Sequence, residues 1–245
     1  MNLRPRLFTA FLLLPALALA DTTTPSDANA KAFPAWAGAA RQRVEEAKAD
    51  AAAIDTVFLG DALTSRWLDP QGGLALWNER FAGHALNFGA PGDGTEHLLW
   101  RLNDIDFSPF APTVRNVVLL IGTNDTTETP DAVAAGIDAV AAKVRPLFPK
   151  ARLLLVGMPH NARADETTQA ANAIERSRAD GKATVYVDLP GAMAPDGKSW
   201  KGLMPDRLHL SPEGYRIWAD LLAAVPAPEA KKEGAEAGAP APAAK

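Results

Sequence analysis

The stretch Val57-Phe58-Leu59-Gly60-Asp61-Ala62-Leu63-Thr64 is an apolar run that stops at a glycine and then turns helical in character. A short run of β-branched and aromatic residues closed by glycine is typical of a buried strand in a parallel sheet. In open α/β sheets, ligands bind beside the loops that follow such strands. We therefore expect the functional site at this strand-to-helix turn.

Four further strand-like runs lie outward from this stretch, at residues 84–88, 114–121, 152–157 and 183–189. Helical patterns separate them, and the clearest begins at Thr129-Pro130 and repeats apolar residues at three- and four-residue spacing to Leu147. Residues 190–208 have no regular pattern. Strands that alternate with helices predict one doubly wound, flavodoxin-like α/β domain, in which helices cover both faces of a five-stranded parallel sheet.

Composition narrows the classes of partner. The chain has 245 residues, of which 47% are hydrophobic and 22% charged, and this suits one soluble domain. A formal charge of −4 gives no basic surface, which argues against nucleic acid and anionic membranes as partners. Cysteine is absent, so disulfides and thiolate metal sites are excluded.

The two ends of the chain differ from the middle. Arg4 and Arg6 precede an apolar run over residues 7–19, and Ala18-Leu19-Ala20 fits a cleavage site. These features predict a signal peptide over residues 1–20 and export to the periplasm or beyond, with a retained membrane anchor as the alternative. We expect a flexible linker over 21–35, a folded domain over 36–225 with no membrane span, and a disordered tail over 226–245.

Four groups of residues stand at the predicted strand ends or before the last helix. Asp61 and Ala62 follow the first strand, Gly92 and Asp93 follow the second, Asn124 and Asp125 follow the third, and Asp206 and His209 precede the last helix. Each group alone could be ordinary turn chemistry. An aspartate three residues before a histidine can accept a hydrogen bond from Nδ1–H and leave Nε2 as a base.

In this order, the four groups resemble the conserved blocks of the SGNH (GDSL) hydrolases over nearly the whole predicted domain. Asn87-Phe88-Gly89-Ala90-Pro91-Gly92-Asp93 and Leu99-Trp100-Arg101-Leu102 look closest to the branch of platelet-activating-factor acetylhydrolase catalytic subunits. The resemblance implies an oxyanion hole formed by the backbone N–H groups of residue 62 and Gly92 and the side-chain amide of Asn124. It also implies that His209 is the general base and that Asp206 orients it.

Two positions depart from the family pattern. Pro91 stands where relatives often have glycine, and Ala62 stands where the family has its nucleophilic serine. Alanine cannot attack a carbonyl carbon, and Thr64 and Ser65 point elsewhere on a helix that turns by about 100° per residue. We expect Asp61 to support the turn structurally, and His160, after the fourth strand, is a possible substrate contact.

Several functions remain open on this basis. One is a protein that binds an acyl or acetyl ester, of a glycan or a lipid, with little turnover. Another is an active esterase, either because His209 activates water or because Ala62 is an introduced substitution. No cofactor is expected, because nucleotide-binding glycine motifs are absent. Asp61, Asp125 and Asp206 have no spacing that demands a metal. The oligomeric state has no signature in the sequence.

Overall fold

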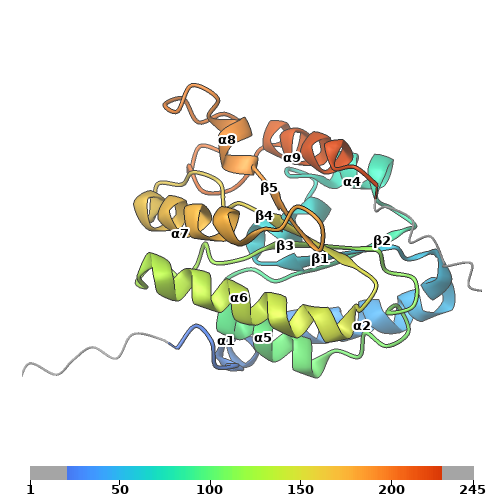
Figure 1. The fold of residues 1–245 in the computed structure, drawn as a ribbon. Coiled ribbons are helices and arrows are strands. Elements are labelled where there is room, and N and C mark those ends of the chain that lie inside the picture. The colour runs from blue at the N-terminus through green and yellow to red at the C-terminus, as the bar shows by residue number, and fades with distance from the viewer. Residues whose placement is uncertain (1–20, 228–245) are drawn as a thin grey trace, which may run out of the picture.

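A parallel sheet of five strands runs through the centre of the molecule (Figure 1). The computed structural model describes residues 21–227. The strands are β1 (Thr56–Gly60), β2 (Ala85–Gly89), β3 (Asn116–Leu120), β4 (Arg152–Val156) and β5 (Thr184–Val187). Their order is β2-β1-β3-β4-β5, the flavodoxin-like arrangement. The predicted fold class and all five predicted strands are confirmed.

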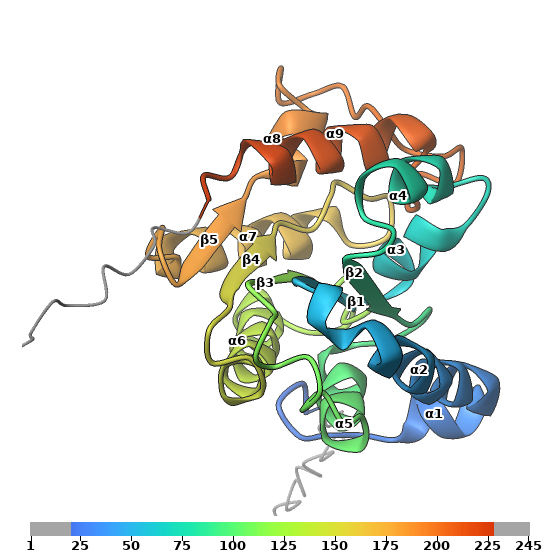
Figure 2. The same ribbon diagram turned by 90° about the vertical axis from the view of Figure 1, so that its right-hand side faces the viewer.

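Helices cover both faces of the sheet (Figure 2). One face packs against α2 (Pro34–Ala47), α5 (Thr95–Asp104), α6 (Pro130–Leu147) and α7 (Asp165–Arg178). The other packs against α3 (Ala62–Ser65), α4 (Leu74–Arg80), α8 (Leu189–Met193) and α9 (Pro212–Ala224). Because side chains alternate along a strand, Val57 and Leu59 enter the first core while Phe58 enters the second.

The second core is rich in aromatic rings. Trp67 and Trp218 are fully buried, and their ring centroids lie 5.3 Å apart. Trp67 also contacts the ring of Tyr215 edge to face, at 4.6 Å. The hydroxyl of Tyr215 donates to the backbone oxygen of Leu63 at 2.7 Å. The last helix is therefore fixed against the turn that follows β1.

Helix starts follow the signals seen in the sequence. Thr129 accepts a hydrogen bond from the backbone N–H of Ala132 at 3.2 Å and Pro130 opens α6. Ser211 and Pro212 begin α9 in the same manner. A capping side chain satisfies one of the N–H groups that have no partner within the helix.

The segment over residues 21–35 is the main difference from the expected organisation. The sequence predicts a flexible linker there, but the structure has the short helix α1 (Ala28–Ala32) and a buried Thr22. The hydroxyl of Thr22 donates to the backbone oxygen of Ala132 at 2.8 Å. The hydroxyl of Thr95 in turn donates to the backbone oxygen of Thr22 at 3.0 Å. These contacts fasten the segment to α5 and α6.

Three smaller elements complete the description. Helix α8 lies in a stretch that was expected to be irregular, and its N-cap Asp188 accepts from Gly191 N–H at 3.1 Å. Two short 3-10 helices, η1 (Lys48–Ala53) and η2 (Arg66–Leu68), follow α2 and α3. No helix in residues 21–227 is long and apolar enough to cross a membrane. The predicted signal peptide lies outside the described residues, as does the predicted tail from residue 228 onward.

Candidate functional site

The carboxyl ends of the three strands β1, β2 and β3 lie level with one another. In the sheet register, Gly60 is paired with Gly89 on one side and with Leu120 on the other. The loops that begin after these residues therefore open at the same edge of the sheet. This edge is the expected binding side of a doubly wound fold.

Asp61 joins two of these loops. It caps α3 by accepting from the backbone N–H of Leu63 at 2.8 Å, and it also accepts from the hydroxyl of Thr123, which follows β3. The side chain is fully buried, and burial raises its pKa to about 6 although both hydrogen bonds and the nearby His209 lower it. Asp61 thus holds the ends of β1 and β3 together.

Ala62 is the first residue of α3 and is half-buried. Its side chain offers only a methyl group at the point where the turn presents a residue to the strand-end loops. The hydroxyl of Ser65, one turn later, donates to the backbone oxygen of Ala62 at 3.1 Å. The turn is held by this bond and by the cap at Asp61, and it presents no nucleophilic atom at position 62.

The loop after β2 is a tight turn. Ala90 N–H donates to the backbone oxygen of Gly60 at 3.0 Å, and Asp93 N–H donates to that of Ala90 at 3.2 Å. Gly92 is exposed and has φ of 81°, a left-handed conformation that glycine adopts without strain. Its N–H makes no hydrogen bond within residues 21–227, so this donor is open to a ligand.

Asp93 and Arg101 form a buried ion pair beneath this loop, which the sequence analysis missed. Arg101 Nε donates to Asp93 Oδ2 at 2.6 Å, and Arg101 also donates to the backbone oxygens of Phe88 and Gly60 at 2.6 and 3.1 Å. Asn29 in α1 donates to Asp93 as well. A detectable signal was present, because Arg101 interrupts the apolar face of α5 formed by Leu98 and Leu102.

The side-chain amide of Asn124 has both ends engaged. Its Nδ2 donates to the backbone oxygen of Asp93 at 2.8 Å, and its Oδ1 accepts from Arg163 Nη1 at 3.0 Å. The first bond uses one of the two amide hydrogens and brings the loops after β2 and β3 together. The second fixes which way the amide faces. The sequence predicts that Gly92 and Asn124 share a site. In the structure they lie on two neighbouring loops, which the bond from Asn124 Nδ2 to the backbone oxygen of Asp93 joins.

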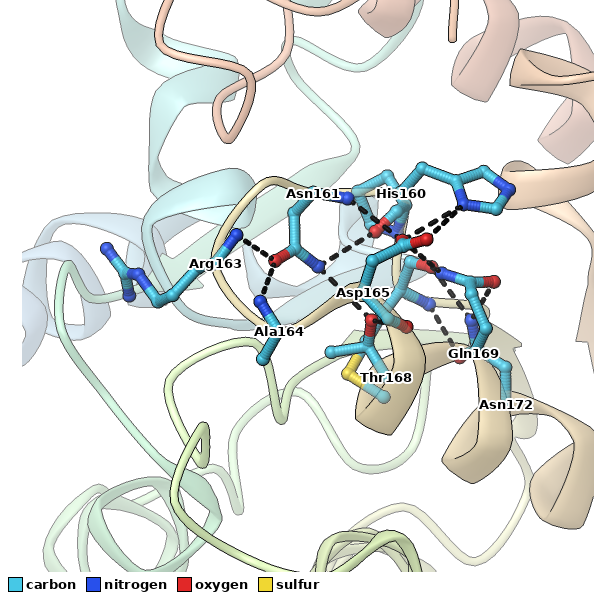
Figure 3. A network of polar contacts seen from close by, with 10 residues as sticks. His160, Asn161, Arg163, Ala164, Asp165, Thr168, Gln169 and Asn172 are labelled. Carbon is cyan, nitrogen blue, oxygen red and sulfur yellow. Dashed lines mark hydrogen bonds and ion pairs between the residues drawn. The ribbon is translucent and has the colours of Figure 1, made fainter. Parts of the chain in front are cut away.

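Arg163 belongs to the loop after β4, and a polar network holds that loop (Figure 3). Buried Asn161 accepts from the N–H groups of Arg163 and Ala164 at 3.0 and 2.9 Å and donates to Thr168 at 3.1 Å. In Figure 3 the exposed side chain of Arg163 extends away from the network. The network therefore fixes the backbone and leaves the guanidinium group available to Asn124.

Asp206 and His209 lie in contact in the turn before α9. The distance from His209 Nδ1 to Asp206 Oδ2 is 2.7 Å, and the N–H groups of Leu208 and His209 both donate to Asp206 Oδ1 at 3.0 Å. Partial burial raises the pKa of Asp206, but these hydrogen bonds outweigh it and lower the pKa to about 2. An ionised Asp206 holds the proton on Nδ1 and leaves Nε2 as an acceptor.

Met204 connects this turn to the residues that follow β1. The backbone oxygen of His209 accepts from Met204 N–H at 2.8 Å. Met204 Sδ lies 3.3 Å from Arg66 Nη2 in the short helix that follows α3. The structure thus brings Ala62 and the Asp206–His209 pair to the same edge.

His160 connects the loops rather than standing free in the site. Its Nδ1 lies 3.0 Å from Asp165 Oδ1 (Figure 3). Its ring also stacks on Trp200, with ring centroids 5.2 Å apart. The guanidinium carbon of Arg207 lies 4.6 Å from the Trp200 ring centroid. Arg207 has φ of 53° and lies between Asp206 and His209. The stack therefore ties the β4 loop to the histidine turn, and substrate contact by His160 stays a prediction.

Asp125 is adjacent to Asn124, and its carboxylate lies against the start of α5. It is buried and accepts from Thr95 N–H at 3.3 Å. Burial, followed by the charge of Glu96, raises its pKa to about 7. Within residues 21–227 no group of three or more carboxylate or imidazole side chains is arranged to hold a metal ion.

Comparison with known proteins gives a consistent family. Residues 58–217 match the model of the GDSL-like lipase/acylhydrolase family. The chain is 34% identical over 168 residues to platelet-activating factor acetylhydrolase IB subunit alpha1 of Rattus norvegicus, covering 66% of this chain and 70% of the relative. It is 29% identical over 174 residues to the human subunit alpha2, with 66% and 71% covered.

Solved structures agree in fold. A GDSL-like lipase from Bacteroides thetaiotaomicron superposes with a TM-score of 0.57 at 19% identity, covering 75% of this chain and 96% of that one. A lipase/acylhydrolase from Enterococcus faecalis has a TM-score of 0.53 at 21% identity, with 69% and 93% covered. At these identities the similarity concerns the fold alone.

Proposed function

The chain belongs to the GDSL-like lipase/acylhydrolase family, and we propose that its site binds a small acyl or acetyl ester of a lipid or carbohydrate without hydrolysing it efficiently. Ala62 carries this proposal, because it directly follows the buried Asp61 where the family resemblance expects a nucleophilic serine. A methyl group has no proton to lose and cannot form an acyl-enzyme. Binding and hydrolysis are therefore separated in this chain.

Ester binding is supported by the donors that remain. The N–H of Gly92 is open, and the Asn124 amide is held at the neighbouring loop by its bonds to Asp93 and Arg163. The backbone N–H of residue 62 does not depend on the side chain. Donors of this kind stabilise the oxygen of a polarised carbonyl and act on a bound ester as well as on a reacting one.

One observation favours a second function. His209 keeps its 2.7 Å contact with Asp206, so a general base persists although the nucleophile is absent. A water molecule activated directly by Nε2 could then attack the ester. Under this alternative the protein is an active esterase or deacetylase. The natural protein is likewise an active esterase or deacetylase if Ala62 is a substitution introduced in place of a catalytic serine.

We also propose that the protein is exported to the periplasm or secreted, on the basis of the charged, apolar and small-residue regions of residues 1–20. Intact-mass analysis of protein recovered outside the cytoplasm is the test. We expect a mature chain that begins at Asp21. A recovered chain that still carries Met1 would contradict cleavage.

Ester turnover before and after Ala62→Ser tests the functional proposal. We expect the parent to hydrolyse 4-nitrophenyl acetate at the background rate and Ala62→Ser to gain at least about 10²-fold, because removing a hydrolase nucleophile elsewhere costs on the order of 10⁶ in kcat. Adding His209→Ala should abolish the gain, since an unassisted hydroxyl is a poor nucleophile. Ala62→Gly, which also lacks a hydroxyl, is the matched control and should stay silent.

Two outcomes oppose the proposal in different ways. Turnover by the parent that disappears on His209→Ala establishes the water-activating alternative. If the folded Ala62→Ser variant does not hydrolyse short acyl esters, and calorimetry detects no binding of these esters to the parent, the proposed ester ligand is ruled out.

A further inference from the structure

A pocket of about 200 Å³ lies between α2 and the loop that follows β2. Its lining includes Trp36, Arg43, Ser65, Ala90, Pro91 and Arg101. Pro91 directly precedes Gly92, and Ser65 lies one helical turn after Ala62. The pocket therefore adjoins the candidate oxyanion loop. None of the expected site residues lines it.

Arg43 gives this pocket a positive charge. The side chain is half-buried, and its Nη1 donates to the backbone oxygen of Asn87 at 2.9 Å. No carboxylate within residues 21–227 is in ion-pair contact with it. Glu46, three residues later on α2, acts on it only through its charge and accepts a hydrogen bond from Gln42 at 2.7 Å. Burial, and then the charge of Arg101, lower the pKa of the Arg43 guanidinium, and the charge of Glu46 offsets only part of this. Its remaining donors have no anionic partner in the described part of the chain.

Neighbouring arginines show the contrast. Arg101, in the same pocket, is neutralised by the buried Asp93 at 2.6 Å. Arg41, two residues before Arg43 on α2, is paired with Asp104 at 2.8 Å. A partly buried guanidinium group is costly without a counter-charge, and its planar fork suits carboxylate and phosphate oxygens. Glu46 balances part of the charge of Arg43 without touching it, and a ligand can supply a counter-charge in direct contact.

Trp36 adds an apolar wall to the same pocket. It is 37% exposed and stacks on Phe33, with ring centroids 4.4 Å apart. An exposed aromatic face beside a guanidinium group suits a ligand whose anionic group is attached to an apolar or ring-shaped body. Trp36 and Arg43 lie seven residues apart on α2, so their side chains are on the same face of the helix and both line the pocket.

We propose that this pocket binds a carboxylate or phosphate group carried by the ester ligand, on the part of the ligand that extends past the oxyanion loop. The substrate class narrows to anionic acyl esters. Arg43 binds the charge, and Trp36 packs against the body of the ligand. This inference rests on the proposed ester-binding function, but its first test does not.

Calorimetric titration of the parent chain with inorganic phosphate, at constant ionic strength held with chloride, measures the pocket directly. We expect saturable binding that Arg43→Gln weakens about tenfold or more, since hydrogen bonds between charged groups are stronger than those between neutral groups. Arg41→Gln removes the same charge from the same helix outside the pocket and should bind as the parent does. Arg43→Lys should retain part of the affinity. The proposed anion-binding role of the pocket is wrong if Arg43→Gln binds phosphate as tightly as the parent does, or if the folded parent binds no phosphate.

A second arm separates free phosphate from an anionic ester. In the Ala62→Ser background, Arg43→Gln should raise KM for 4-carboxyphenyl acetate several-fold and leave KM for phenyl acetate unchanged. An equal effect on both esters contradicts an anionic subsite for the ester. If Ala62→Ser is inactive but phosphate binding still depends on Arg43, the ester function fails while the anion pocket stands.

Discussion

Arg163 Nη1 donates to Asn124 Oδ1 at 3.0 Å, and this one contact sets the orientation of a side-chain amide at the edge of the candidate site. With the oxygen engaged by a cation, Nδ2 must face the opposite side, where it donates to Asp93. In the proposed oxyanion hole, an amide rotated by half a turn would present its oxygen instead of its N–H to the ester carbonyl and repel it. Arg163 therefore acts as a positioning residue for Asn124.

We predict that Arg163→Gln lowers kcat in the Ala62→Ser background by about tenfold, less than the 10²–10³ that loss of an oxyanion donor costs elsewhere. Arg163→Lys should recover part of the loss, because one donor returns. On the parent chain, the side-chain amide signals of Asn124 in ¹⁵N correlation spectra should shift with Arg163→Gln. Unmoved Asn124 signals would show that the contact does not orient the amide.

A second prediction concerns the segment before α2. Asn29→Ala removes a donor to the buried Asp93 and should lower the free energy of unfolding by about 1–2 kcal/mol. Asp27→Ala, on the same segment, breaks an exposed pair with Lys31 and should cost at most about 0.5 kcal/mol. Denaturant titration measures both. Equal, negligible effects would restore the view of this segment as a passive linker.

The strands and the main helices were predictable because local periodicity encodes them. The apolar run that ends at Gly60 and the cap at Thr129 are both readable from neighbouring residues. The N-terminal segment was not, because its composition resembles a linker and its order depends on distant partners such as Ala132 and Asp93. Local propensity contains no information about contacts more than sixty residues away.

The candidate site divides in the same way. Asp206 and His209 are three residues apart, so their contact could be expected from the sequence. The contact between Asn124 and Arg163 joins two crossover connections and leaves no local signature. Arg101 could be recognised in the sequence as a charged residue on an apolar helix face. Its partner Asp93 could be identified only from the structure, because the conformation of the loop after β2 brings the two side chains together.

The buried pair Asp93–Arg101 should dominate stability near the site. Arg101→Met leaves Asp93 charged and buried, and we expect a loss of about 3–5 kcal/mol, as for other buried pairs broken on one side. Asp93→Asn combined with Arg101→Met should cost less than the sum of the two single changes. Arg101→Lys keeps the charge, and its free energy of unfolding should lie between those of the parent and Arg101→Met. A double-mutant cycle from denaturant unfolding gives the coupling, and strict additivity would refute it.

The last prediction follows from the raised pKa of Asp125. The ordinary pKa of an aspartate is 3.8, and burial raises that of Asp125 to about 7. The folded protein therefore holds this proton more tightly than the unfolded chain. The stabilisation is fully present below about pH 4 and is lost as pH rises toward about 7, because the folded state must then bury a carboxylate.

Asp125→Asn removes the titration and keeps the shape. We expect the variant to match the parent near pH 4 and to exceed its free energy of unfolding at pH 8 by up to about 4 kcal/mol, since each unit of the shift from 3.8 to about 7 corresponds to about 1.4 kcal/mol. The amide oxygen can still accept from Thr95 N–H. Asp50→Asn, on the exposed end of η1, is the control and should show no such divergence. Denaturant unfolding at a series of pH values measures both variants, and a parent-to-variant difference that stays constant from pH 4 to pH 8 would mean that Asp125 is already ionised throughout this range.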